Sequence, residues 1–323
     1  MISLHSIFKK TSGIENSMHL PLQTPIAFFI FNRPDLTAQV FERIAQAKPK
    51  ILFLIADGPR TAEEKKRCDS ARRAVERVDW ECHVLRHYSE ANLGCARRVA
   101  SGLDWVFSQT EEAIILEDDC LPDLSFFFFC QEMLHRYRKE QRIGHIGGNN
   151  YLQKTRRPES GYYFSRYALS WGWATWRRAW NGYDLCLSGW PELRENGWLD
   201  NHCDNPAQIA HWKRMFDSVC TPYPHTWDFQ WQYHVWKQQA LSIAPARNLV
   251  ANLGCRPDAT HTRKPMGRSR VPTHAVWDWP PPSEIGRDRA ADLETFERAH
   301  NDRPLKTGWQ TLASLFKPFR KKP

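Results

Sequence analysis

Between residues 25 and 116, short apolar segments alternate with longer segments that have helical character. The apolar segments cover 26–31, 51–56, 82–85 and 113–116. Runs of this length bounded by turn residues predict buried strands. The intervening segments predict helices that begin at Pro34, near Ala62 and after Asn92-Leu93-Gly94. Repeated strand–helix units favour right-handed crossovers between parallel strands, so the sequence predicts an α/β fold.

Polar and charged residues follow three of these predicted strands. Asn32-Arg33 follow the first strand, Asp57 follows the second, and Glu117-Asp118-Asp119 end the fourth. Parallel sheets bind ligands beyond the carboxyl ends of their strands. We therefore expect these side chains to meet at one edge of the sheet and to form a binding site there.

The acidic triplet Glu117-Asp118-Asp119 is the most informative motif. Three adjacent carboxylates repel one another and are costly to desolvate. A divalent cation removes that cost, and hard oxygen ligands suit Mg²⁺ or Mn²⁺ that holds a diphosphate. A solvated turn is the alternative interpretation, because short acidic runs are usually solvated.

Three arginines and one aspartate are candidates for nucleotide contacts. Arg97 and Arg98 fall in the first turns of a predicted helix, where guanidinium groups suit a diphosphate. Asp57 can accept a hydrogen bond from a base or a ribose hydroxyl, and Arg33 can contact a nucleotide. The alternatives are a solvated basic face for Arg97 and Arg98, a turn-forming aspartate, and an exposed loop arginine.

The second half of the chain is rich in tryptophan, with thirteen of the fifteen beyond position 170. Trp171, Trp173 and Trp227 are candidates for stacking on a sugar or a base, because indoles are flat and apolar. Packed core is the commoner environment of a tryptophan. Asp228 falls in the first turn of a helix expected to reach Gln239. It is a candidate general base, or else an aspartate that stabilises the helix start.

Composition places the protein among ordinary globular chains, with 41% hydrophobic and 25% charged residues. No apolar segment approaches the ~18 residues of a membrane span, and residues 1–10 lack the apolar core of a signal peptide. The nine cysteines form no C-x-x-C pair. They predict free thiols in a reducing cytosol. Phosphate-loop motifs are absent, so we expect phosphate to be held through a metal and arginines.

Changes in composition divide the chain into four regions. Residues 1–24 form an N-terminal extension, 25–150 the α/β half, and 151–265 a tryptophan-rich half of the same domain. Residues 266–323 are rich in proline and basic residues, and this composition predicts a loosely packed tail with a short amphipathic helix near 309–316. Pro280-Pro281-Pro282 excludes regular structure in that part of the tail.

The residues from Pro25 to Thr262 together resemble GT-A type glycosyltransferases that use nucleotide-sugar donors. They are most similar to N-acetylglucosaminyltransferase-I-like enzymes and their bacterial relatives. The likeness rests on the Phe31–Pro34 segment, Asp57-Gly58, Asn92-Leu93-Gly94, the acidic triplet, and Trp227-Asp228. The resemblance implies a Rossmann-like fold with a mixed, mainly parallel sheet.

The resemblance also implies roles for the strand-end carboxylates. Asp119 would bind Mn²⁺ or Mg²⁺ directly, Asp118 would face the ribose, and Glu117 would lie in the network between sugar and metal. Asp57 matches the residue that binds uridine.

In the second half, Asp228 matches the catalytic base of the family, and Thr260-His261 matches a pair in the donor-side loop. His261 is therefore a candidate metal or phosphate ligand, although a lone histidine is more often structural. One departure concerns the segment after Trp227-Asp228, where Phe229-Gln230 stand in place of the second Asp. That difference bears on the acceptor, which Trp171, Trp173 and Trp227 would help to shape.

The sequence thus favours a metal-dependent hexosyl- or N-acetylhexosaminyl-transferase. It would move a sugar from a nucleotide diphosphate, a UDP-sugar by resemblance, to a hydroxyl acceptor with inversion. The acceptor would be a glycan, a lipid-linked molecule or a small molecule, in bacterial surface-polysaccharide or glycoconjugate synthesis. The alternatives are a nucleotidyltransferase on a similar fold and a non-catalytic carbohydrate-binding protein.

The net charge of +9 comes from lysine and arginine that are spread along the chain, except for a basic cluster at 317–322. We expect small anionic substrates rather than nucleic acid as partners. Together with the absence of membrane spans, this predicts a cytoplasmic protein. Peripheral contact with the inner face of a membrane through the basic C-terminus is an open alternative.

Overall fold

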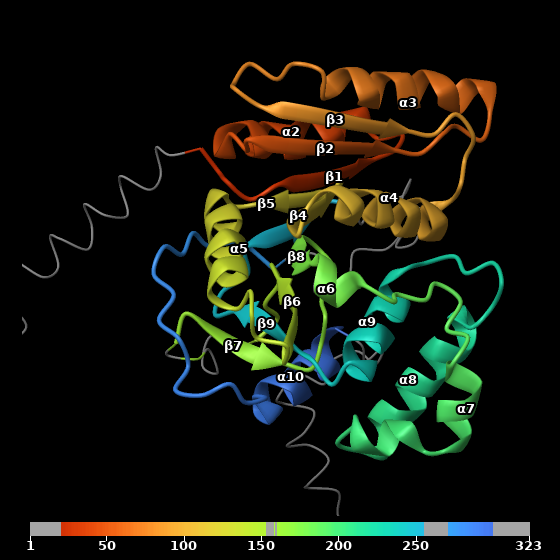
Figure 1. Cartoon of the computed structure of the whole chain (residues 1–323), viewed down its shortest axis with the longest axis vertical. Helices are drawn as coiled ribbons and strands as arrows, with labels where there is room; N and C mark the ends of the chain where they lie inside the picture. The colour runs from red at the N-terminus through yellow and green to blue at the C-terminus, as the bar shows by residue number, and fades with distance from the viewer. Residues whose placement is uncertain (1–20, 153–157, 159, 255–270, 300–323) are drawn as a thin grey trace, which may run out of the picture.

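A computed structural model of the chain describes residues 21–152, 158, 160–254 and 271–299 (Figure 1). Most of the predicted N-terminal extension, the Thr260-His261 pair and the helix expected near 309–316 lie outside the described residues.

An eight-stranded sheet runs through both halves of the chain in the order β3-β2-β1-β4-β8-β6-β9-β7. Its strands are β1 (Ile26–Ile30), β2 (Ile51–Ala56), β3 (His83–Tyr88), β4 (Glu112–Glu117), β6 (Ile143–Gly147), β7 (Tyr162–Ser165), β8 (Trp173–Trp176) and β9 (Leu241–Pro245).

The order of the strands and their directions confirm the predicted fold class. Strands β3, β2, β1 and β4 are parallel neighbours. Strand β8 is antiparallel to both β4 and β6, β9 is parallel to β6, and β7 is antiparallel to β9. The result is an α/β protein with a mixed, mainly parallel, Rossmann-like sheet.

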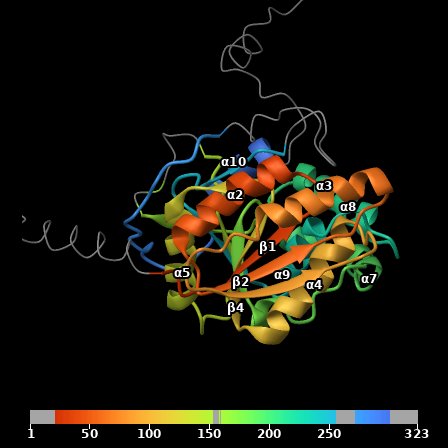
Figure 2. The same cartoon turned by 90° about the horizontal axis from the view of Figure 1, so that it is seen from above.

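The apolar runs form the central strands because both faces of the sheet are covered. Helices α2 (Pro34–Ala47) and α5 (Leu124–Arg136) pack on one face, against Phe28 and its neighbours. Helix α4 (Cys95–Gln109) packs on the other face, against Phe29 and Ile115. Figure 2 shows α2 and α4 on opposite sides of the strands.

Two boundaries in this half differ from the prediction. The third strand was expected at 82–85 but continues to Tyr88. It is the edge strand of the sheet, so its outer residues are half-exposed and lack the apolar run that marks the central strands. The charged helix was expected to run from Ala62 to about Val78, but α3 (Ala62–Ala74) is shorter.

Short helices of the second half pack around an aromatic core. They are α6 (Arg177–Trp180), α7 (Trp190–Glu195), the 3-10 helix η2 (Trp198–Asn201), α8 (Pro206–Val219) and α9 (Asp228–Lys237). Helices α8 and α9 meet through Trp212, Phe216, Tyr233 and Trp236. This packing fixes the start of α9, where Asp228 lies.

A second, two-stranded sheet joins distant parts of the chain. Strand β5 (Cys120–Pro122) directly follows the acidic triplet and pairs antiparallel with β10 (Val250–Asn252). The backbone N–H of Leu253 donates to the Asp119 carbonyl oxygen over 2.8 Å. This pairing brings residues 252–254 to the end of β4.

The prediction of a loosely packed tail is wrong for part of that segment. Residues 271–282 form no helix or strand, as the three prolines predict, but helix α10 (Arg289–Ala299) packs on the sheet edge at β7. Phe296 is 7% exposed and stacks against Tyr167.

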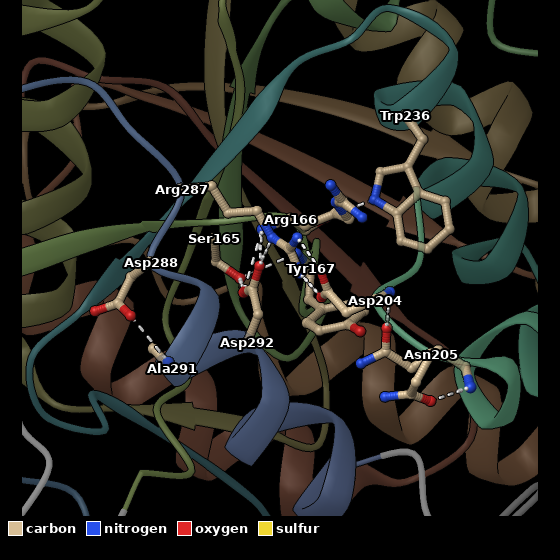
Figure 3. Close-up of polar contacts among 11 residues, drawn as sticks. Ser165, Arg166, Tyr167, Asp204, Asn205, Trp236, Arg287, Asp288, Ala291 and Asp292 are labelled. Atoms are coloured by element: carbon tan, nitrogen blue, oxygen red, sulfur yellow. Dashed lines mark hydrogen bonds and ion pairs between the residues drawn. The ribbon is translucent and has the colours of Figure 1, made fainter. Parts of the chain in front are cut away.

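An ion-pair network holds α10 in place (Figure 3). The Asp292 carboxylate is fully buried and accepts hydrogen bonds from the Ser165 hydroxyl and the Arg166 backbone N–H. Arg287 pairs with Asp292 and also with Asp204. These partners are far apart in the sequence, which is why local composition did not reveal the helix.

Candidate functional site

A cavity of about 550 Å³ opens beyond the carboxyl ends of β1, β2 and β4. The start of α4, the start of α9 and residues 252–254 complete its walls. The predicted site residues that line it are Arg33, Asp57, Arg98, Glu117, Asp118, Asp119, Trp171, Trp227 and Asp228. The expected convergence of strand ends is therefore present.

Arg33 forms ion pairs with two members of the acidic triplet. Its Nη1 lies 2.8 Å from Oδ2 of Asp119, and its Nη2 contacts Oδ1 of Asp118. The Asp118 side chain is 3% exposed and also accepts a hydrogen bond from the Phe31 backbone N–H. Because β1 and β4 are adjacent parallel strands, the residue after β1 reaches the residues after β4 directly.

Charge and burial shift the pKa values in this cluster. Burial alone would lower the pKa of Arg33, but attraction to Asp118 and Asp119 outweighs it and raises the pKa. Burial raises the pKa of Glu117 to about 8, and the charges of Asp119 and, more weakly, Asp228 act in the same direction. The Arg33 guanidinium thus offsets part of the repulsion among the three carboxylates, which the sequence analysis expected a divalent cation to relieve.

The fit of the triplet to a divalent cation depends on which ligands would complete the site. Among the described residues, no group of three or more His, Cys, Asp or Glu side chains could hold a metal. Asp119 lines the cavity with its side chain 16% exposed, and its Oδ2 lies beside Gly254, which has no side chain. Mg²⁺ is commonly bound by one or two carboxylates plus substrate phosphates and water. Asp119 fits that mode of binding.

The Asp57 carboxylate accepts hydrogen bonds from the backbone and the side chain of neighbouring loops. Its Oδ1 accepts from the backbone N–H groups of Gly58 and Leu93, and its Oδ2 accepts from Gly94 N–H and the Asn92 side-chain amide, over 2.8–3.0 Å. A carboxylate offers about four acceptor positions. The geometry therefore favours the turn-forming alternative over direct contact of Asp57 with a nucleotide.

Arg98 is buried at the wall of the cavity, whereas Arg97 does not reach the cavity. The Arg98 side chain donates to the His87 carbonyl oxygen over 2.6 Å, and the residue is 4% exposed. The buried Nε of Arg98 has no hydrogen-bond partner. No described carboxylate forms an ion pair with the guanidinium, although the charge of Asp57 attracts it from further away. Arg97 instead lies over the ring of Tyr223, 4.9 Å from its centroid. The prediction that Arg97 lines the donor site is wrong in this structure.

Asn32 also lies outside the cavity lining. Its side-chain amide donates to Oε1 of Glu64 on α3 over 2.8 Å. This structure does not support the predicted contact of Asn32 with a donor, because the Asn32 amide is hydrogen-bonded to Glu64 of α3.

Asp228 is the first residue of α9 and lines the same cavity as the triplet. Its Oδ1 accepts a hydrogen bond from the Thr226 hydroxyl, and among the described residues no donor reaches Oδ2. The buried Gln230 amide fixes this turn by donating to the carbonyl oxygens of Thr226 and Leu185. The Tyr183 hydroxyl holds the Trp227 carbonyl oxygen over 2.8 Å. One carboxylate oxygen of a rigid Asp228 is thus available to a ligand.

The three predicted tryptophans have different environments. Trp171 lines the cavity while half-buried, and Trp227 lines it although only 2% exposed. Trp173 is 1% exposed and lies between His145 and Trp227, with ring centroids 5.3 Å from each. The prediction that Trp173 contacts an acceptor is wrong, because Trp173 is packed core.

Sequence reasoning missed the segment Asn252-Leu253-Gly254. Asn252 and Gly254 line the cavity, and the Asn252 side chain accepts from the Gly254 backbone N–H over 2.8 Å. The tripeptide repeats the Asn-Leu-Gly at 92–94. Each copy meets an aspartate that follows a strand, Asp57 in one case and Asp119 in the other. The repeat was the signal that could have identified it.

Comparison with known proteins gives little further information. No family model matches the sequence, and no curated protein matches it. A solved structure of UDP-glucose pyrophosphorylase complexed with UDP-glucose is similar, with a TM-score of 0.32 and 8% sequence identity. That match covers 69% of this chain and 90% of the other. A likeness this weak carries no argument about the site.

The described part of the chain has no helix with the length and apolar character needed to cross a membrane.

Proposed function

We propose that this protein is a glycosyltransferase that moves a sugar from a nucleotide-diphosphate donor, a UDP-sugar, to a hydroxyl acceptor with inversion. One observation carries the proposal. The buried Arg98, which has no ion-pair partner among the described residues, lines the same cavity as the acidic triplet and Asp228. A cationic side chain that can bind phosphate, a carboxylate that can bind a metal and a general base can therefore act on one bound molecule.

The donor would bind along the strand ends. A buried guanidinium without a carboxylate partner is costly and favours an anionic ligand, because desolvation strengthens its attraction. The first turn of α4 lies at the same wall and adds the positive end of a helix dipole. Arg98 and α4 would together hold the diphosphate.

Asp119 would hold Mg²⁺ or Mn²⁺, which when bound supplies positive charge to the departing diphosphate. Arg33 already contacts Asp119, so it is placed to contribute charge to the same phosphoryl group.

Asp228 would act as the general base. As the acceptor oxygen forms its bond to the anomeric carbon, its proton passes to Oδ2 of Asp228. The bond between the anomeric carbon and the diphosphate oxygen breaks, and its electron pair leaves with the nucleoside diphosphate. Attack on the face opposite the leaving group inverts the anomeric centre. The contacts of Thr226 and Gln230 hold the base in position.

The cellular setting belongs to the proposal as well. The resemblance to bacterial enzymes and the basic cluster at 317–322 favour surface-polysaccharide or glycoconjugate synthesis at the cytoplasmic face of a membrane. The acceptor would then be a glycan or a lipid-linked or small molecule.

Ligand binding gives the first test. We expect UDP and UDP-sugars to raise the melting temperature of the full chain, more strongly with Mn²⁺ than with EDTA. Arg98→Met should weaken UDP binding at least tenfold, while Arg97→Met, its neighbour outside the cavity, should leave it within twofold. Equal loss in both variants, or no UDP binding by the parent, would contradict the proposal.

Replacement of the base gives the second test. Asp228→Asn keeps the shape of the side chain but cannot accept the proton. We expect it to lower turnover at least a hundredfold while the Kd for UDP changes less than threefold. Parallel losses of turnover and UDP affinity would make Asp228 a structural residue.

A further inference from the structure

A second cavity, of about 180 Å³, lies next to the first. The two share four lining residues, which are Ser170, Trp171, Asp228 and Phe229. Asp228 therefore stands at the boundary, with the strand ends and the triplet on one side and the second cavity on the other. A molecule in the second cavity would present its atoms to the proposed base from the side away from the β-strand ends.

Helices and hydrogen bonds hold part of the wall of the second cavity in place. Helix α8 contributes Trp212 and Met215, and α9 contributes Gln232. Both polar atoms of the Gln232 side chain are engaged, since Oε1 accepts from Ala168 N–H over 2.8 Å and Nε2 donates to the Arg166 carbonyl oxygen over 3.0 Å. Ala299, the last residue of α10, closes another side. The Arg287–Asp292 network that anchors α10 thus helps to shape this cavity (Figure 3).

The chemistry of the walls is aromatic and nearly uncharged. Tyr151 meets Trp171 at 84° with ring centroids 6.1 Å apart, and Trp212 meets Phe229 at 77° with centroids 6.3 Å apart. Among the described lining residues there is no lysine, arginine or glutamate, and the residues that can carry a charge are Asp228 and His211. A carboxylate or phosphate on the ligand would therefore face the charge of Asp228, and a protonated His211 is the one cation that these walls could offer against it.

The size of the cavity restricts the ligand further. About 15 Å³ of such space is needed for one water molecule, so the cavity holds on the order of a dozen non-hydrogen atoms. That is the size of a single hexose. A sugar ring offers apolar C–H faces to aromatic walls and hydroxyl groups to Asp228, whereas an alkyl chain would leave the carboxylate without a hydrogen-bond donor.

We propose that the second cavity binds one neutral sugar ring of the acceptor and directs a hydroxyl of that ring toward Asp228. This inference rests on the proposed function and deepens it, since it names the chemical class of the acceptor. Met215 lines the second cavity and does not line the donor cavity.

The test uses the full chain with UDP-sugars as donors and measures UDP release. The acceptor panel contains methyl glycosides of neutral hexoses, hexuronic acids, hexose phosphates and a linear alkyl alcohol. We expect a neutral glycoside to stimulate UDP release at least tenfold over water. Met215→Trp should fill the cavity and remove at least nine-tenths of this stimulation, while UDP affinity stays within twofold. Met215→Leu, which preserves volume, should retain it.

Lys213→Trp is the matched control, because it adds the same side chain at an exposed position of α8. It should behave like the parent. Phe229→Ala gives a second variant if Met215→Trp does not fold, and it should raise the KM for the neutral glycoside at least tenfold. Because Phe229 lines both cavities, UDP affinity is measured alongside and should stay within twofold.

The outcomes separate this inference from the proposed function. If the parent neither binds UDP nor releases it from UDP-sugars, the proposed function fails. If the parent binds UDP but accepts no neutral glycoside, prefers a charged acceptor or the alkyl alcohol, or keeps its stimulation in Met215→Trp, the inference about the second cavity is overturned while the proposed function stands.

Discussion

At the scale of single residues, buried charges and polar groups define this protein more sharply than its apolar core does. Arg33 forms ion pairs with both Asp118 and Asp119, Asp57 accepts four hydrogen bonds, and Arg98 has no ion pair with a described residue. A buried charge must be paired or must await a ligand. Arg33 therefore has a structural role in addition to its proposed contact with phosphate, whereas Arg98 is a candidate binding group without a carboxylate in an ion pair.

Removal of Arg33 should destabilise the protein and make it sensitive to divalent cations. Arg33→Ala leaves the buried Asp118 unpaired, so we expect a loss of about 3 kcal/mol in the free energy of unfolding. Millimolar Mn²⁺ should restore part of that loss, because the cation can offset the same charges. Urea denaturation with and without Mn²⁺ measures both effects. Arg43→Ala, an exposed change on α2, should cost less than about 0.5 kcal/mol.

The buried His145 should make stability depend on pH. Trp231 donates to its Nδ1 and its Nε2 donates to the Leu169 carbonyl oxygen, so the ring is neutral. Burial lowers the pKa of His145 to about 3, below the value near 6.5 expected when unfolded. The unfolded chain therefore binds the proton first as the pH falls below about 6.5, and stability is lost between there and about pH 3.

The slope of that loss would be up to about 1.4 kcal/mol per pH unit for one histidine. His202 and His234, whose pKa values burial also lowers, add to it. His145→Gln should be less stable than the parent at pH 7.5 but should lose less on going to pH 5. Chemical denaturation at both values measures the difference. Identical losses in parent and variant would show that His145 does not titrate this way.

At the scale of secondary-structure elements, the sequence succeeded where an element carries its own signal. Strands β1, β2 and β4 are continuous apolar runs, and Pro34 marks the first turn of α2. The sequence failed to predict the extent of an element, or its existence, where contacts with a distant part of the chain determine it. Strand β3 lies at the sheet edge and is only partly apolar, and α10 depends on an ion pair with the distant Asp204.

The network at α10 should be one of the larger single contributions to the stability of the second half. Arg287→Ala leaves the fully buried Asp292 without its cation, and we expect a cost of about 3 kcal/mol. Arg194→Ala on α7 removes only exposed pairs with Glu195 and Asp217 and should cost less than about 1 kcal/mol. Equal effects in urea denaturation would argue against a structural role for the Arg287 network.

At the scale of the whole molecule, the site is assembled from stretches that lie far apart in the chain. The strand ends come from the first half, Asp228 begins α9, and the pairing of β5 with β10 carries Gly254 to Asp119. The chemistry proposed for the cavity requires all of them together. A change at the junction of these stretches should therefore disturb the site without unfolding the protein.

Gly254→Ala tests that junction. A Cβ atom at this position would lie 2.0 Å from Oδ2 of Asp119, so the carboxylate must move. We expect Mn²⁺-dependent UDP binding to weaken at least tenfold while the melting temperature changes by only a few degrees. Gly286→Ala, whose Cβ would have no neighbour nearer than 3.6 Å, is the control and should leave UDP binding intact. Isothermal titration with UDP distinguishes the two.

The sequence by itself determined the class of fold and the edge of the sheet at which a site forms. Alternating apolar and helical segments are local signals, and parallel strands bring their carboxyl ends together whatever the rest of the chain does. Only the tertiary structure decided which candidates face the cavity. In the folded protein Trp173 is packed in the core, and Asp57 accepts hydrogen bonds from the loop at 92–94. Arg98 lines the cavity, and Gly254 lies against Asp119. Those outcomes depend on contacts between residues far apart in the chain, which a local pattern cannot encode.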